Sequence, residues 1–204
     1  MATLTYFFAT VSPFTYLAGT RLEEICARHG LEIDYRPLDV IALFARTGGV
    51  APKDRHESRL AYRLQELERQ ARKTGLPLNL KPAFWPTNPA PSSYAFIAAQ
   101  SAVRAGKADG DLGALAHGFT RACWAEERNI AEDDVVRDVL AGAGFDPSLA
   151  DSGMLAGAET YAANLEDAVR MGAFGAPFYI TPDDRRFWGQ DRLDDLDLAL
   201  KGEI

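Results

Sequence analysis

The chain has few of the side chains that redox and metal chemistry require. Its 204 residues include only two cysteines and three histidines. Cys26 and Cys123 lie far apart, and each falls on the apolar side of a helical pattern, so we expect both thiols to be buried and free. No histidine stands at metal-ligand spacing from a cysteine or from another histidine. The sequence therefore predicts no metal site and no disulfide chemistry.

The sequence also lacks long apolar runs and an excess of positive charge. No run approaches the ~20 apolar residues of a membrane-spanning helix, and the N-terminus lacks the basic and apolar segments of an export signal. The net charge of −7 argues against binding nucleic acid or anionic membrane by bulk electrostatics, although it allows a local cationic pocket. We therefore expect a cytoplasmic protein that binds neither nucleic acid nor membranes.

What is present is an ordered series of strand and helix patterns in a chain long enough for a proper core. The predicted strands are residues 3–9, 31–37, 178–181 and 185–187. The predicted helices are residues 13–29, 54–74, 92–105, 112–127, 132–141, 153–171 and 191–200, and residues 76–91 form an ordered loop. The strand–helix–strand unit at the start implies a parallel pair with a right-handed crossover. The sequence predicts an α/β fold of order βαβ…ββα, in which a sheet domain of residues 1–40 and 172–204 is interrupted by an all-helical insertion of residues 41–171.

The first chemically informative motif is Ser12-Pro13-Phe14-Thr15, where the first predicted strand meets a helix. A thioredoxin-like redox protein would carry cysteines at the two ends of this motif, and here they are serine and threonine. No nearby histidine or lysine in the sequence serves as a base, so we do not interpret Ser12 as a nucleophile. Ser12 is either a hydrogen-bond donor to a thiolate that arrives with a ligand or a simple N-cap before Pro13.

Two further motifs lie near the C-terminus. In residues 172–177, the Ala176-Pro177 bond after a glycine-rich turn is a candidate cis peptide, whose neighbouring backbone is free to pair with an extended ligand; the alternative is a plain loop. In residues 187–192, Gln190 and Asp191 either bind the charged end of a ligand or, for Asp191, cap the last helix. A thioredoxin-like fold brings all three motifs to one end of the sheet, where a peptide-like thiol with the anatomy of glutathione would fit.

In combination these motifs resemble the 2-hydroxychromene-2-carboxylate isomerases, bacterial relatives of the kappa-class glutathione transferases within the DsbA-like branch of thioredoxin folds. The stretches that carry the resemblance span nearly the whole chain: residues 12–18, 36–38, 44–48, 82–88, 164–168, 172–177 and 187–192. The resemblance implies a thioredoxin-like fold, glutathione as cofactor and, because relatives form dimers, a homodimer.

The resemblance also implies roles for individual residues. Ser12 would bond the glutathione sulfur, and Arg59, where relatives often carry a lysine, would lie near the glycine carboxylate. The cysteinyl backbone and the γ-glutamyl end would be held by Ala176 before cis-Pro177, and by Gln190 and Asp191. One departure from the family is Gly49, which stands where relatives often have asparagine, so one polar contact to glutathione or substrate is expected to be missing.

The reaction implied by the resemblance is isomerisation of an aromatic catabolite through reversible addition of the glutathione thiolate. Phe84, Trp85 and Asn88 would line a pocket for the small aromatic substrate, although the aromatic residues suit a core position equally well. Two alternatives remain at this point: a kappa-like glutathione transferase or peroxidase, and a non-catalytic thioredoxin-fold binding protein in which Ser12 is only a cap.

Overall fold

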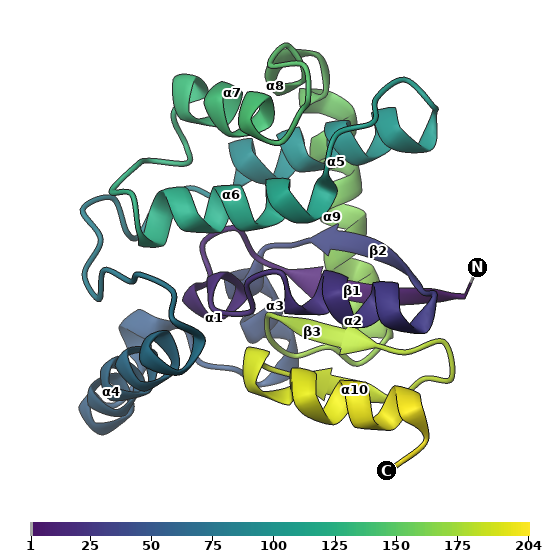
Figure 1. The fold of residues 1–204 in the computed structure, drawn as a ribbon. Helices are drawn as coiled ribbons and strands as arrows, with labels where there is room; N and C mark the ends of the chain where they lie inside the picture. Colours follow the sequence, from purple (N-terminus) through teal and green to yellow (C-terminus); the bar gives the residue numbers. More distant parts are fainter. Residues whose placement is uncertain (1) are drawn as a thin grey trace.

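The centre of the molecule is a mixed sheet of four strands in the order β2-β1-β3-β4 (Figure 1). The structure, a computed structural model, describes residues 2–204. β1 (Thr3–Phe8) pairs in parallel with β2 (Glu32–Pro37) and antiparallel with β3 (Phe178–Ile180), and β3 pairs antiparallel with β4 (Arg186–Trp188). Strands from the two ends of the chain thus meet in one sheet, which confirms the predicted α/β fold.

Helices cover both faces of this sheet (Figure 1). They are α1 (Pro13–Tyr16), α2 (Arg21–His29), α3 (Val40–Thr47), α4 (Glu57–Thr74), α5 (Ala90–Arg104), α6 (Leu112–Trp124), α7 (Asp133–Gly142), α8 (Leu149–Ser152), α9 (Met154–Arg170) and α10 (Leu193–Lys201), with 3₁₀ turns at Pro52–Asp54 and Gln190–Arg192. In Figure 1 the helices α5 to α8 lie above the sheet, α10 lies below it, and α4 projects at the lower left. Within residues 2–204, none of these helices combines the length and apolar character needed to cross a membrane.

The sheet separates two hydrophobic clusters because successive side chains of a strand point to opposite faces. Tyr6 and Phe8 of β1 join the larger cluster, which includes residues of α1, α2, α5 and α6. Phe7 joins the smaller cluster against α3 and α9, where it meets Leu43 and Ala168. Since both faces are covered, β1 is apolar along most of its length. The predicted division of the chain into a sheet domain and a helical insertion of residues 41–171 stays a prediction. Two helices of that insertion, α3 and α9, pack directly on the sheet.

The predicted continuous helix over residues 13–29 is wrong, because the chain turns between α1 and α2. Gly19 adopts a φ of +60°, a left-handed conformation that glycine tolerates best. The Arg21 guanidinium donates to the carbonyl oxygens of Leu17 (3.1 Å) and Ala18 (3.2 Å), which satisfies acceptors that the break leaves free. The break places Arg21 next to the C-terminal turn that forms part of the site described below.

Other helices also differ from the prediction, among them the short α8, which was not predicted. α3 was not predicted, and it begins where the Asp39 carboxylate accepts bonds from the N–H groups of Ile41 (2.9 Å) and Ala42 (3.0 Å). The last helix begins at Leu193 rather than at Asp191, after a 3₁₀ turn.

Candidate active site

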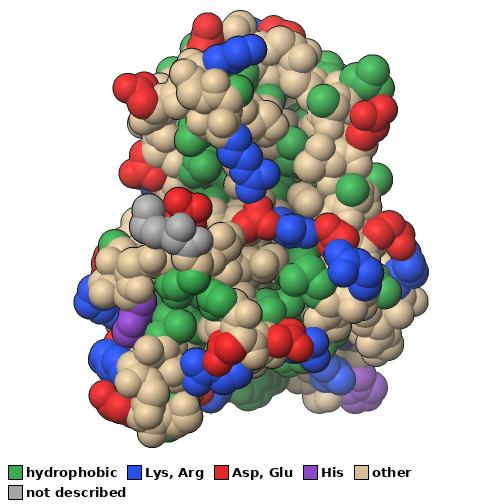
Figure 2. Space-filling view, turned by 90° about the vertical axis from the view of Figure 1, so that its right-hand side faces the viewer, with side chains coloured by type: hydrophobic (Ala, Val, Ile, Leu, Met, Phe, Trp, Pro, Cys, Tyr) green, Lys and Arg blue, Asp and Glu red, His purple; other side chains and the backbone are tan. Residues whose placement is uncertain are grey.

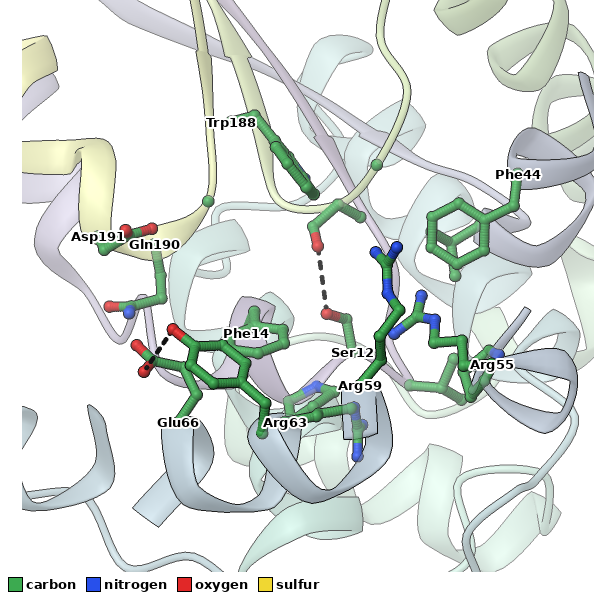
Figure 3. A pocket seen from close by; sticks show the side chains of 18 of the residues that line it. Ser12, Phe14, Phe44, Arg55, Arg59, Arg63, Glu66, Trp188, Gln190 and Asp191 are labelled. Atoms are coloured by element: carbon green, nitrogen blue, oxygen red, sulfur yellow. Dashed lines mark hydrogen bonds between the residues drawn. The ribbon is translucent and has the colours of Figure 1, made fainter. Parts of the chain in front are cut away.

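A cavity of about 730 Å³ opens beside the end of the sheet, a volume in the range of small-molecule sites. Its walls come from α1, α3, α4 and the turn before α10, so both ends of the chain contribute (Figure 3). The structure brings together most of the predicted site residues around it: Ser12, Arg59, Trp85, Ala176, Gln190 and Asp191.

Ser12 lies at the floor of this cavity and is 7% exposed. Its Oγ accepts a hydrogen bond from the Thr15 N–H (3.2 Å), so the N-cap interpretation is confirmed. The same hydroxyl faces the carbonyl oxygen of Ala176 at 3.4 Å (Figure 3). That distance is long for an O–H···O bond, so the proton is weakly engaged and available to a stronger acceptor. No histidine or lysine of residues 2–204 lines the cavity to act as a base for Ser12.

The segment opposite Ser12 contains the predicted cis peptide bond between Ala176 and Pro177. The Pro177 carbonyl accepts a hydrogen bond from the Gly189 N–H (3.0 Å), which ties this segment to the turn before α10. The bond between Trp85 and Pro86 is also cis, which the sequence did not predict.

Gln190 is 2% exposed and has a fixed orientation. Its Oε1 accepts from Arg21 Nη2 (2.6 Å), and its backbone carbonyl accepts from the same nitrogen (3.0 Å). Because Oε1 is occupied by Arg21, the amide N–H group of Gln190 is left to donate to a ligand. Arg21 therefore positions Gln190, a role that local sequence did not signal.

Asp191 presents its carboxylate at the cavity, beside Arg192 (3.0 Å). It does not cap the following helix, so the cap interpretation of this residue is wrong. A side chain at Gly189 would bring its Cβ within 2.5 Å of Asp191 Oδ1, and Gly189 has a φ of +103°. Only glycine therefore allows the turn and the carboxylate to take these positions.

Three arginines line the α4 side of the cavity: Arg55, Arg59 and Arg63. Only Arg59 was predicted, although the four-residue spacing was a signal that placed all three on one side of a helical pattern. Arg55 Nε donates to the Val50 carbonyl (2.8 Å), and burial, with a smaller effect of Arg59, lowers the pKa of Arg55. Burial, followed by repulsion from Arg55, lowers the pKa of Arg63 to about 10, so Arg63 stays charged at neutral pH.

The predicted aromatic pocket is only partly present. Trp85 lines the cavity and also packs against Trp124, with ring centroids 5.6 Å apart, so both interpretations of this residue apply. Phe84 and Asn88 do not line the cavity: Phe84 is exposed, and Asn88 Oδ1 accepts from the Ala90 N–H (3.0 Å) at the start of α5. The aromatic wall is completed by residues that were not predicted to line a pocket: Phe14, Phe44, Tyr62 and Trp188.

The departure at Gly49 has a structural counterpart in Phe44. A Cβ at Gly49 would lie 2.6 Å from Phe44 Cδ1, closer than atoms can pack. The Arg55 guanidinium lies over the same Phe44 ring, with its carbon 5.5 Å from the ring centroid. The place of the missing amide is therefore bordered by an aromatic ring and a cation.

Comparison with known proteins agrees with this architecture. The sequence model of the DSBA-like thioredoxin domain matches residues 3–201. A 2-hydroxychromene-2-carboxylate isomerase of Sphingobium xenophagum is 29% identical over 97% of each chain, and one of Pseudomonas putida is 28% identical over 96% of this chain and 92% of that protein.

Solved structures give the same result for the fold. A 2-hydroxychromene-2-carboxylate isomerase superposes with a TM-score of 0.80 at 25% identity, covering 98% of this chain and 95% of the other. A probable DsbA oxidoreductase of Streptomyces coelicolor superposes with a TM-score of 0.72 at 19% identity, covering 100% and 92% of the two chains, which supports the fold alone. With the sheet order, the cis-proline segment and a family match over nearly all of its length, this chain belongs to the DSBA-like thioredoxin domain family.

Proposed function

We propose that this chain is a glutathione-dependent isomerase of 2-hydroxychromene-2-carboxylate or related aromatic catabolites. The observation that carries the proposal is the serine hydroxyl at the cavity floor, where Ser12 Oγ faces the Ala176 carbonyl at 3.4 Å. Because no cysteine lines the cavity within residues 2–204, the sulfur of the reaction has to arrive with a ligand. Relatives named for this isomerase activity align over nearly the whole chain.

The residues around the cavity fit the three parts of glutathione. The Ser12 hydroxyl is weakly engaged and suits the sulfur, while the Arg59 guanidinium, which has no ion pair within residues 2–204, suits the glycyl carboxylate. The free amide N–H group of Gln190 and the carboxylate of Asp191 suit the α-carboxylate and ammonium of the γ-glutamyl end. The backbone beside Pro177, at Ala176, suits the cysteinyl peptide group.

The chain's own groups have separate tasks in this reaction. When bound, glutathione supplies a thiolate that adds reversibly to the conjugated substrate and leaves unchanged. The Ser12 hydroxyl donates to that sulfur, and because a hydrogen bond to the charged form favours it, Ser12 lowers the thiol pKa from about 8.5 toward neutrality. Trp85 and Phe14 provide flat apolar surface beside Ser12, which holds a planar substrate and keeps water from the sulfur.

The test is turnover of 2-hydroxychromene-2-carboxylate to trans-o-hydroxybenzylidenepyruvate with substoichiometric glutathione. We expect isomerisation that requires glutathione and leaves the free thiol concentration unchanged. Loss of thiol in proportion to product would instead indicate a glutathione transferase. Calorimetry that detects no glutathione binding at millimolar concentration would leave the non-catalytic binding protein.

A cytoplasmic location and a homodimer are further parts of the proposal. Cys26 and Cys123 are free and buried, which suits a reducing compartment, and burial raises the pKa of each thiol to about 12. Analytical ultracentrifugation tests the dimer, and a monomer at micromolar concentration would contradict it.

A further inference from the structure

The three arginines on the α4 side of the cavity are unusual in this chain because they lack carboxylate partners, whereas Arg192, which also lines the cavity, pairs with Asp191 and Asp195. On the face shown in Figure 2, basic and acidic side chains lie interspersed, and most arginines of the chain form ion pairs, such as Arg72 with Glu68 on α4. No ion pair within residues 2–204 includes Arg55, Arg59 or Arg63. In a chain of net charge −7, this local excess of positive charge favours binding of anions in the cavity.

The cavity has more cationic groups than glutathione needs. Arg59 is assigned to the glycyl carboxylate in the proposed function, and Arg55 is held by the Val50 carbonyl over the Phe44 ring. Arg63 is left without a role. No side-chain hydrogen bond or ion pair within residues 2–204 engages its guanidinium nitrogens, so they are available to a ligand.

Two aromatic rings hold Arg63 in place. Its guanidinium carbon lies 5.2 Å from the Trp85 ring centroid and 5.8 Å from that of Trp124. A guanidinium that is stacked on aromatic faces keeps its N–H edge directed outward and loses little entropy when it binds a planar anion. The side chain is partly buried, so a carboxylate that meets it there is less screened than at the surface.

The position of Arg63 separates it from the glutathione contacts. In Figure 3, Ser12 lies in the middle, Gln190 and Asp191 lie to one side, and Arg63 lies below, on α4. A ligand that extends from Gln190 past Ser12 to Arg59 does not need the Arg63 guanidinium, which is left for a second molecule in the same cavity. On the side of Arg63 the cavity offers a flat indole and a cation, which match a planar aromatic acid.

We propose that Arg63, held on Trp85, binds the carboxylate of a planar aromatic substrate and makes the site selective for acids over neutral electrophiles. The identity of this molecule as the substrate rests on the proposed function, whereas its binding requires no glutathione. A charge-assisted pair of hydrogen bonds to a guanidinium changes affinity by about 10- to 100-fold.

The experiment compares two unreactive ligands of the same shape, chromone-2-carboxylate and chromone-2-carboxamide. Quenching of tryptophan fluorescence, which Trp85 and Trp188 report from the cavity wall, gives the Kd of each ligand without glutathione. We expect the wild type to prefer the carboxylate about 10- to 100-fold. Arg63→Gln should abolish that preference and Arg63→Lys should keep part of it. The control Arg72→Gln, on the same helix but paired with Glu68, should keep all of it.

Equal Kd values of the two ligands in the wild type would overturn the proposal whatever the folding of the variants. A carboxylate preference that persists in Arg63→Gln, with a circular dichroism spectrum like that of the wild type, would also overturn it. Failure of the proposed function has a different signature: glutathione would not bind, or its thiolate absorbance would not depend on Ser12. The carboxylate preference is measured without glutathione, so it does not depend on glutathione binding or on the thiolate absorbance.

Discussion

Replacing Ser12 by alanine separates two contributions of one hydroxyl. Its Oγ accepts from the Thr15 N–H at 3.2 Å, and loss of this cap should lower the free energy of unfolding by about 1 kcal/mol. The same hydroxyl lines the cavity and is only weakly engaged by the Ala176 carbonyl at 3.4 Å, and a hydrogen bond to a charged sulfur contributes about 1.5–3 kcal/mol. Since one pKa unit corresponds to about 1.36 kcal/mol, Ser12→Ala should raise the pKa of the bound glutathione thiol by about one to two units.

The assay is a pH titration of the ultraviolet thiolate absorbance of the protein–glutathione complex. In the wild type we expect the thiol pKa to lie below its usual value of about 8.5, so that a large part of the bound glutathione is thiolate at neutral pH. In Ser12→Ala the titration should shift upward, and the absorbance at neutral pH should fall. Cys26 and Cys123 do not contribute in this range, because burial raises the pKa of each to about 12.

Matched variants separate the hydrogen bond from loss of stability. Asp111→Ala removes the N-cap of α6, where Asp111 accepts from the Ala114 N–H at 2.9 Å, and Asp111 does not line the cavity. Asp111→Ala should lower the free energy of unfolding by a similar ~1 kcal/mol and leave the thiol titration unchanged. Ser12→Thr retains a hydroxyl and should retain the low pKa. If Ser12→Ala still binds glutathione with an unshifted titration, the role assigned to Ser12 is wrong.

Three further predictions follow from contacts outside the floor of the site. Gly49→Asn should lower the unfolding free energy by about 1–3 kcal/mol, because its Cβ would lie 2.6 Å from the Phe44 ring. Adding Phe44→Ala should recover part of this loss; if denaturant melts show that the two losses of unfolding free energy simply add, the clash is refuted. Both cysteines should resist a thiol reagent in the native protein and react after denaturation, whereas rapid native labelling would show that they are accessible. Asp197→Asn should lower stability at neutral pH and flatten its decline in acid, because hydrogen bonds from Lys201 and then His29 hold the pKa of Asp197 well below its usual ~3.9. This stabilisation is present above pH ~4 and disappears as the pH falls below it, so equal acid slopes in urea melts of variant and wild type would contradict the assignment.

The sheet could be predicted from sequence because its signals are local. β1 and β2 show apolar and alternating patterns between clear helix boundaries, and β3 and β4 flank a turn. The break between α1 and α2 was not predicted, although the five-residue step from Leu17 to Leu22 departs from helical spacing and contains Gly19. The contact of Arg21 with Gln190 on the other side of this break joins residues 169 positions apart, and a local pattern contains no information about such a contact.

The site was predictable where residues lie at junctions of strands and turns, as Ser12, Ala176 and Gln190 do. Arg63 was not predicted, because its four-residue spacing from Arg59 places the two on one side of a helix but does not say whether that side faces a cavity or solvent. Which way it faces depends on the rotation of α4 against the rest of the molecule. Phe84 and Asn88 neighbour Trp85 in a loop, where no periodicity determines the direction of a side chain.

The weak attachment of α4 has an evolutionary consequence. Of its 18 residues only Leu67 is buried, whereas the hydroxyl of Ser12 and the backbone of Ala176 are supported by the packed end of the sheet. Substitutions at exposed positions generally change stability little, so most of α4 can vary without endangering the fold. Relatives can therefore exchange a cation such as Arg63 on this helix to accept a different ligand, while Ser12 and Ala176 keep their positions.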